Sequence, residues 1–180
     1  MITAEQIQEF VQQMRKGFEN TPYPGDDNIG STGIEDIEQE LVGVRWQDVT
    51  MQHLWDLRAG MVFLKPDAFR YYLPAFLLGV LQFTDELDAF SETFIPFLIP
   101  PPSIWQFIGD EGLPPPSDWY EKYIGNGRQF LALDALSAEQ KKLVGLCLKM
   151  IAEIYPDRDW NTLAPKSLAQ AIAYWEQYVT

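Results

Sequence analysis

The side chains best suited to chemistry are the adjacent carboxylates Asp26 and Asp27, which lie with Asn28 in the turn-forming segment PGDDNI. Carboxylate and amide oxygens are the ligands that Ca²⁺ and Mg²⁺ prefer, and paired carboxylates can act as general acid and base with neighbours such as Glu35 or Glu38. The spacing of an EF-hand is absent. We therefore expect Asp27 or Asn28 to hold the loop by side-chain-to-backbone hydrogen bonds, with a carboxylate-based metal site or enzyme as the alternative.

Other catalytic sets are not evident in the sequence. One histidine, His53, and one cysteine, Cys147, are too few for a Cys/His metal site. Neither a nucleophile elbow nor a Walker-type phosphate loop is present. We interpret His53 as a partly exposed helical residue and Cys147 as a buried thiol. The sequence thus predicts no catalytic residue, no assigned metal ligand and no cofactor.

The element that must position the candidate residues is residues 65–81. Apolar residues recur there at helical spacing, at Ala68, Phe69, Tyr72, Leu73, Phe76, Leu77, Val80 and Leu81. Pro66 suits the first turn of a helix, whereas Pro74 removes a hydrogen bond and predicts a kink or a split. We expect this segment to be the central helix of the core.

Arg70 lies on the less apolar side of that helix. A salt bridge on the helix surface is its common role. The sharper hypothesis is that Arg70 pairs with Asp26 or Asp27 and holds the loop against the central helix.

Helical periodicity extends over most of the remaining chain. It predicts helices between Thr3 and Asn20 and over residues 34–42, 50–59, 85–97, 137–154 and 165–179. Thr3 with Gln6, and Ser137 with Gln140, have the spacing of capping boxes, and Thr84 is a candidate cap for residues 85–97. Strand signals are weak, with residues 61–64 the best of them. The fold class predicted is all-α: one compact orthogonal-type domain, residues 1–180, of six to seven helices around a proline-kinked central helix.

A proline-rich segment interrupts this helical pattern. Two triple prolines, residues 100–102 and 114–116, bracket Trp105 and Phe107. We expect an ordered crossing segment whose aromatic rings pack on the helices. There are two alternatives for this segment. It could be a ligand for an SH3-like domain, or its aromatic residues could form an oligomer contact together with Trp119.

The formal net charge of −13 limits the partners. Residues 1–120 carry the whole excess, with 19 acidic and 6 basic side chains. Such a field repels phosphate backbones and anionic lipids, so neither nucleic acid nor membrane is expected; a basic protein, a cation or simple solubility remain. A single cysteine, an N-terminus unlike a signal peptide and the lack of a long apolar run favour a cytoplasmic protein, as a monomer or weak homodimer.

Three motifs in order resemble a known family. They are YPGDDNI at residues 23–29, Trp46 after a short acidic segment, and AFRYYLPAFL at residues 68–77. This pattern resembles an uncharacterised family of small bacterial proteins, the domain of unknown function 6714. The resemblance implies a shared organisation and brings no reaction, substrate or cofactor with it. It draws attention to the loop and to the speculative binding residues Asp26, Asp27, Asn28, Trp46 and Arg70.

Together these features favour a non-enzymatic protein-binding domain of the immunity or adaptor kind, which would bind a basic partner. The alternative is a carboxylate-based metal-binding protein or enzyme that uses Asp26 and Asp27.

Overall fold

The computed structural model of the chain describes residues 2–30, 40–100, 125–160 and 167–179. Its α-helices in these ranges are α1 (Ala4–Gly17), α3 (Met51–Leu57), α4 (Pro66–Phe83), α5 (Asp88–Phe94), α8 (Gly125–Ala132), α9 (Ala138–Ile154) and α10 (Ser167–Trp175). The described ranges contain no strand, only one isolated bridge between Gly30 and Leu64. The all-α prediction is confirmed. No helix in the described ranges has the length and apolar character needed to cross a bilayer.

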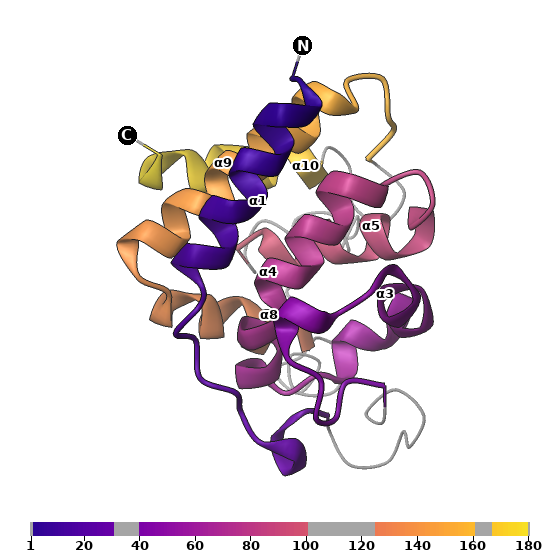
Figure 1. Ribbon diagram of the computed structural model, residues 1–180, viewed down its shortest axis with the longest axis vertical. Coiled ribbons are helices and arrows are strands. Elements are labelled where there is room, and N and C mark those ends of the chain that lie inside the picture. The colour runs from indigo at the N-terminus through magenta and orange to yellow at the C-terminus, as the bar shows by residue number, and fades with distance from the viewer. Residues whose placement is uncertain (1, 31–39, 101–124, 161–166, 180) are drawn as a thin grey trace, which may run out of the picture.

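Helix α4 is the central helix, as expected (Figure 1). It contacts α1, α3, α5, α8 and α9, and every residue from Tyr71 to Leu81 is buried. A helix that is apolar all round is stable only inside a core, because each of its faces must be kept from water. Pro66 occupies the first turn, and the helix runs through Pro74 without a split. Packing on every side therefore offsets the helix-breaking effect of Pro74, which is about 3 kcal/mol.

Aromatic rings join α4 to α5 and to the 3₁₀ turn that follows it. The ring of Phe76 lies 6.0 Å from Phe69, 5.6 Å from Phe90 and 5.7 Å from Phe94, measured between ring centroids. Phe69 also stacks on Phe97 at 5.4 Å. These separations suit offset and edge-to-face aromatic pairs, so this cluster is a well-packed centre of the core.

Both predicted capping boxes are present. Thr3 and Gln6 exchange side-chain-to-backbone hydrogen bonds at the start of α1, and Ser137 and Gln140 do the same at α9. Each box satisfies two N–H groups that a helix start otherwise leaves without partners. The beginnings of these two helices are consequently determined by local sequence.

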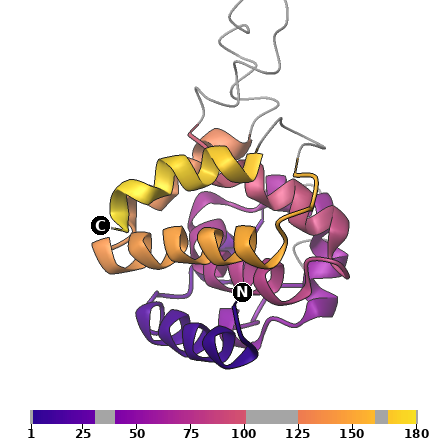
Figure 2. The ribbon, with the colours of Figure 1, turned by 90° about the horizontal axis from the view of Figure 1, so that it is seen from above.

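Helix α9 lies between α1 and α10 (Figure 2). On the α1 side, Gln140 Nε2 donates to the carbonyl oxygen of Gly17 at 3.2 Å. On the α10 side, a Cβ atom at Gly145 would lie 2.9 Å from the carbonyl oxygen of Trp175. Gly145 therefore permits an approach of the two helices that a larger residue would prevent.

Several predicted boundaries differ from the structure. Residues 61–64 belong mainly to a 3₁₀ helix, Arg58–Phe63, instead of a strand. The helix expected over residues 85–97 is shorter, and Thr84 does not cap it. The Thr84 hydroxyl donates to Val80 O, four residues back, which is a common bond for threonine in a helix. Residues 34–39 and the proline-rich segment with Trp105, Phe107 and Trp119 lie outside the described ranges.

Candidate functional site

The Asp26–Asn28 loop is a single 3₁₀ turn built on its own side chains. Gly25 has φ 90°, a left-handed conformation that favours glycine. Asn28 Nδ2 donates to the carbonyl oxygen of Pro24 at 3.0 Å, which confirms the expected side-chain-to-backbone bond. The Tyr23 hydroxyl donates to Asp26 Oδ1 at 2.6 Å. The loop is thus ordered by local hydrogen bonds before any partner binds.

Lys65, and not Arg70, connects this loop to the central helix. Lys65 Nζ donates to the carbonyl oxygen of Asp27 at 2.6 Å, and the Lys65 amide donates to Ile29 O at 2.9 Å. Arg70 pairs instead with Asp67, at 3.0 Å and one turn earlier on α4. The sharper hypothesis for Arg70 is therefore wrong, and its common role is confirmed. Pairing with a carboxylate on the same helix costs less side-chain entropy than pairing with a distant loop, which explains why Arg70 contacts Asp67.

Trp46 and the two adjacent tyrosines of α4 form a second connection. The Tyr72 hydroxyl lies 2.7 Å from Leu41 O and 2.8 Å from Val44 O, so the two carbonyl groups share its single donated proton. The Tyr71 hydroxyl accepts from the Trp46 amide at 3.4 Å. These bonds hold residues 41–46 against α4.

Tyr23 brings the loop and the α4 tyrosines together. Its ring lies 5.3 Å from that of Tyr71, edge to face, and Tyr71 in turn lies 4.9 Å from Tyr72. The Tyr23 hydroxyl also accepts from the amide of Gly43 at 2.9 Å. One network of contacts thus joins the motif residues Asp26 and Trp46 to the α4 tyrosines. Its contacts hold the loop and residues 41–46 against α4, which is a structural role.

The pH dependence of stability is expected to report on Tyr72. Burial, and then the nearby Tyr23 and Tyr71, raise the pKa of its phenol above the ordinary value near 10. The unfolded chain therefore loses this proton first, and the stabilising effect, complete below pH 10, is lost as pH rises above it. Urea unfolding above pH 10 should show wild-type stability falling more steeply than that of Tyr72→Phe, by up to about 1.4 kcal/mol per pH unit. Parallel pH profiles for the two proteins would contradict this.

The remaining candidates have structural environments. His53 Nδ1 accepts from the Thr50 amide at 2.9 Å, so the imidazole caps α3. Cys147 is fully buried with Sγ 3.8 Å from Leu77 O, and burial raises the pKa of the thiol. Both interpretations from sequence are confirmed. Within the described ranges no group of three or more His, Cys, Asp or Glu side chains could hold a metal ion, and Glu35 and Glu38 lie outside those ranges.

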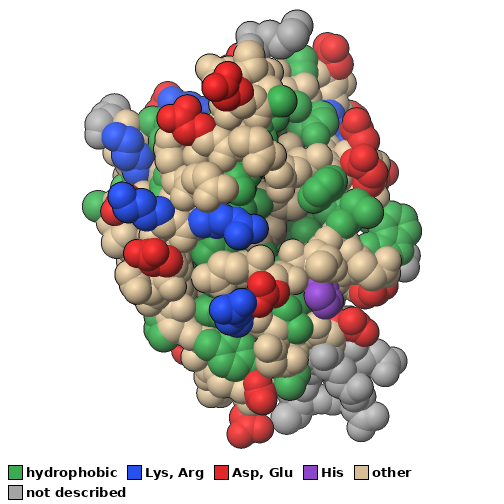
Figure 3. All heavy atoms as spheres, in the orientation of Figure 1, with side chains coloured by type: hydrophobic (Ala, Val, Ile, Leu, Met, Phe, Trp, Pro, Cys, Tyr) green, Lys and Arg blue, Asp and Glu red, His purple; other side chains and the backbone are tan. Residues whose placement is uncertain are grey.

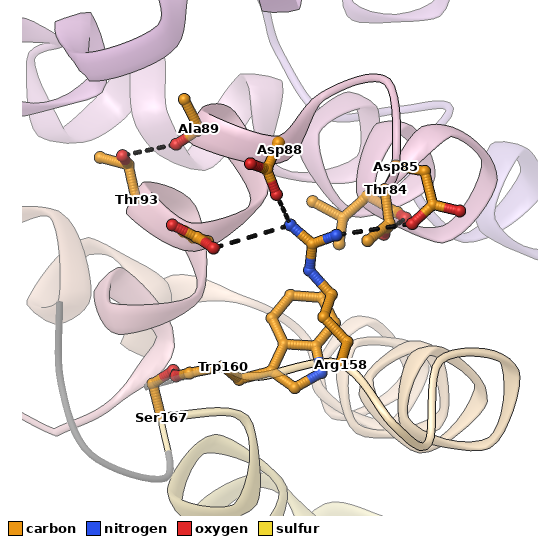
Figure 4. Close-up of polar contacts among 10 residues, drawn as sticks. Thr84, Asp85, Asp88, Ala89, Thr93, Arg158, Trp160 and Ser167 are labelled. Carbon is orange, nitrogen blue, oxygen red and sulfur yellow. Dashed lines mark hydrogen bonds and ion pairs between the residues drawn. The ribbon is translucent and has the colours of Figure 1, made fainter. Parts of the chain in front are cut away.

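A different site is centred on Arg158, which sequence reasoning missed. Asp85, Asp88 and Glu92, from the end of α4 through α5, converge on its guanidinium group (Figure 4). Nη2 bonds Asp88 and lies 3.8 Å from Glu92, while Nη1 lies 3.5 Å from Asp85. The Arg158 side chain is 14% exposed, against 79% for Asp85 and 69% for Asp88. One largely buried guanidinium group thus contacts three carboxylates, of which Asp85 and Asp88 are mostly exposed to solvent.

A pocket of about 260 Å³ adjoins this cluster, between the last turn of α9 and the first turns of α10. Arg158 lines it together with Trp160, and the guanidinium carbon lies 5.1 Å from the centre of the indole ring. Ser167 Oγ donates to Trp160 O. Arg158 Nε and Trp160 Nε1 are buried N–H groups that have no hydrogen-bond partner among the residues that the structure describes. The arrangement can accept an apolar group that carries a hydrogen-bond acceptor.

The surface charge is unevenly placed around these elements. On the face shown in Figure 3, Lys and Arg gather on the side of α1 and α9, and the charged side chains on the side of α3 and α5 are mainly Asp and Glu. The Arg158 pocket also borders acidic surface, because Arg158 lines it and contacts the carboxylates of Asp85 and Asp88. The sequence signal for it was weak: a lone arginine in Asp157–Trp160 gives no hint of partners some 70 residues away in the chain.

Comparisons with known proteins add the family. No curated protein and no solved structure matches the chain. A family of unknown function, DUF6714, matches residues 26–179, which include the loop, the central helix and the Arg158 pocket. The chain therefore belongs to this family of unknown function, as the three sequence motifs predicted.

Proposed function

We propose that this chain is a non-enzymatic binding domain that recognises a basic protein through the acidic surface around Arg158. The observation that carries the proposal is the convergence of Asp85, Asp88 and Glu92 on one guanidinium group. Three carboxylates against one cation leave a local charge of about −2 at neutral pH. Surface carboxylates in excess attract a cationic partner over about a Debye length and accelerate association.

The composition of the whole chain supports the same partner class. The net charge is −13, and on the face shown in Figure 3 most of the Lys and Arg side chains lie on the side of α1 and α9. A cytoplasmic location is part of the proposal, because the one cysteine is a buried free thiol, as suits a reducing compartment.

The test compares two triple variants with the same change in charge. The first is Asp85→Asn with Asp88→Asn and Glu92→Gln; the control removes three exposed carboxylates of the α1 region, through Glu5→Gln, Glu9→Gln and Glu19→Gln. Immobilised proteins would capture partners from an extract of the source cells at about 0.05 M and 0.5 M NaCl. We expect the wild-type protein to capture a specific basic protein at low salt. The captured amount should fall about tenfold at high salt. It should fall similarly with the first variant and stay unchanged with the α1 control.

Two results would overturn the proposal. One is equal capture by the first variant and the α1 control, which would mean that only the total charge matters. The other is a captured partner that is acidic, or whose binding does not respond to salt.

A further inference from the structure

The pocket between α9 and α10 has the size of a side-chain site. Its volume of about 260 Å³ is below the ~300–1,000 Å³ of pockets that enclose drug-sized ligands or cofactors. A space of this size suits one aliphatic or aromatic side chain. Protein interfaces commonly gain most of their affinity from a few such anchors inserted into pockets.

The walls of the pocket favour an apolar occupant. Ala152 and Tyr155 of the α9 end face Leu168 and Ile172 of α10 across it. Ile172 is only half-buried, so its side chain still has surface to lose to an incoming group. Removing such surface from water stabilises a complex by about 25 cal/mol per Å².

Trp160 supplies a polar contact that the protein itself leaves unused. The residue is 8% exposed, and within the described part of the chain its Nε1 has no hydrogen-bond partner. Figure 4 shows the nitrogen edge of the ring turned away from the three carboxylates, toward α9 and α10. A buried donor without a partner is unfavourable, so an acceptor that enters beside the ring gains a hydrogen bond of more than usual strength.

The charges around the pocket determine which residues can flank the side chain that occupies it. Arg158 belongs both to the pocket wall and to the cluster of Asp85, Asp88 and Glu92. A segment that extends from the pocket past Arg158 therefore meets the negatively charged α5 surface. Lysine or arginine next to the anchor would meet these carboxylates, whereas acidic neighbours would be repelled.

We infer that the pocket takes one apolar side chain of a partner protein, presented between basic residues. A backbone carbonyl of the same segment accepts a hydrogen bond from Trp160 Nε1. This inference rests on the proposed function and adds to it the chemical class of the recognised segment, namely an aliphatic or aromatic residue flanked by lysine or arginine.

Three synthetic probes separate the contributions. They are the acetylated and amidated peptides Lys-Lys-Leu-Lys-Lys and Lys-Lys-Ala-Lys-Lys, and uncharged N-acetyl-leucinamide. Binding is followed by the NMR signal of the Trp160 indole N–H, assigned by its loss in Trp160→Phe. We expect the leucine peptide to shift this signal and to bind about tenfold more tightly than the alanine peptide. Isothermal titration calorimetry, which does not depend on the indole signal, should show that Trp160→Phe binds the leucine peptide severalfold more weakly than the wild type does.

A matched pair of variants tests the location. Ala169 and Ala173 are both exposed on α10, and only Ala169 lines the pocket. Ala169→Phe adds a ring to the pocket lining and should reduce leucine-peptide affinity about tenfold, while Ala173→Phe should leave it unchanged. Circular dichroism of both variants verifies that α10 is intact.

The outcomes distinguish this inference from the proposed function. Salt-dependent binding that is equal for the leucine and alanine peptides, and unaffected by Ala169→Phe, would overturn the pocket inference alone. N-acetyl-leucinamide that shifts the Trp160 signal as strongly as the leucine peptide would overturn the basic partner and retain an apolar site. Failure of all three probes to perturb the Trp160 signal would overturn the inference outright.

Discussion

Replacement of Phe76 by alanine is expected to lower the free energy of unfolding by about 4 kcal/mol, the typical effect of truncating a buried aromatic residue. Phe76 is completely buried in the middle of α4. Its ring contacts Phe69 and Tyr72 on its own helix and Phe90 and Phe94 on α5. Truncation therefore leaves a cavity at the junction of two helices, which neighbouring rings cannot fill without leaving their own contacts.

Phe83→Ala is the matched control for this prediction. Phe83 ends the same helix and is only half-buried, so less apolar surface is lost and water can replace the ring. Urea unfolding followed by circular dichroism should give the larger shift in midpoint for Phe76→Ala. Equal losses in the two variants would show that the aromatic cluster is not the centre of the core.

Replacement of Tyr72 by phenylalanine is expected to lower the free energy of unfolding by about 2 kcal/mol at pH 7. The Tyr72 hydroxyl is the partner of the carbonyl groups of Leu41 and Val44, at 2.7 Å and 2.8 Å. Phenylalanine keeps the ring and its packing but removes the one hydroxyl proton that the two oxygens share. Leu41 O keeps its bond from the Val44 amide, at 3.1 Å, whereas Val44 O loses its side-chain donor. Loss of this bond also weakens the attachment of residues 41–44 to α4, which the Trp46 amide and the Tyr71 hydroxyl still support.

Tyr155→Phe provides the comparison in the same urea experiment. Its hydroxyl lies 3.5 Å from Leu81 O in a partly buried position, so the bond it loses is long and water is near. We expect a change within about 0.5 kcal/mol. Similar losses for the two tyrosines would contradict a special role for Tyr72 and would place residues 41–44 outside the stabilising network.

Local interactions explain which parts of the fold could be predicted. The capping boxes of α1 and α9 involve residues three apart, and the buried faces of α4 and α9 follow helical spacing. Asn28 bonds Pro24 within its own loop. Sequence patterns report such contacts directly, because the partners are close in the chain whatever the rest of the molecule does.

Helix α8 shows where local patterns fail. It begins Gly-Asn-Gly, which opposes helix formation, and it was not predicted. The described part of α8 carries the buried residue Phe130, and Gln129 Nε2 donates to Leu64 O at 2.8 Å. Contacts with α4 and with this distant carbonyl therefore stabilise a helix that its own sequence does not favour.

The candidate sites likewise combine local contacts, which the sequence predicts, with long-range contacts, which it does not. Asp26, Asp27 and Asn28 were identifiable as a turn, but their anchor is Lys65, 38 residues beyond Asp27. Arg70 has the carboxylate of Asp67 one turn away on α4, and it pairs with this neighbour instead of with the loop carboxylates. Arg158 could not be identified at all, because its carboxylate partners precede it by some 70 residues.

By itself, the sequence determined the helical class, the central position of α4, the caps of α1 and α9, and the family. These follow from periodicity and from motifs whose parts are neighbours in the chain. Only the tertiary structure decided how the loop is attached, how α8 forms, and where a pocket lies beside excess carboxylates. The physical reason is that ion pairs and pockets depend on which distant segments are brought together, and packing of the whole core decides that.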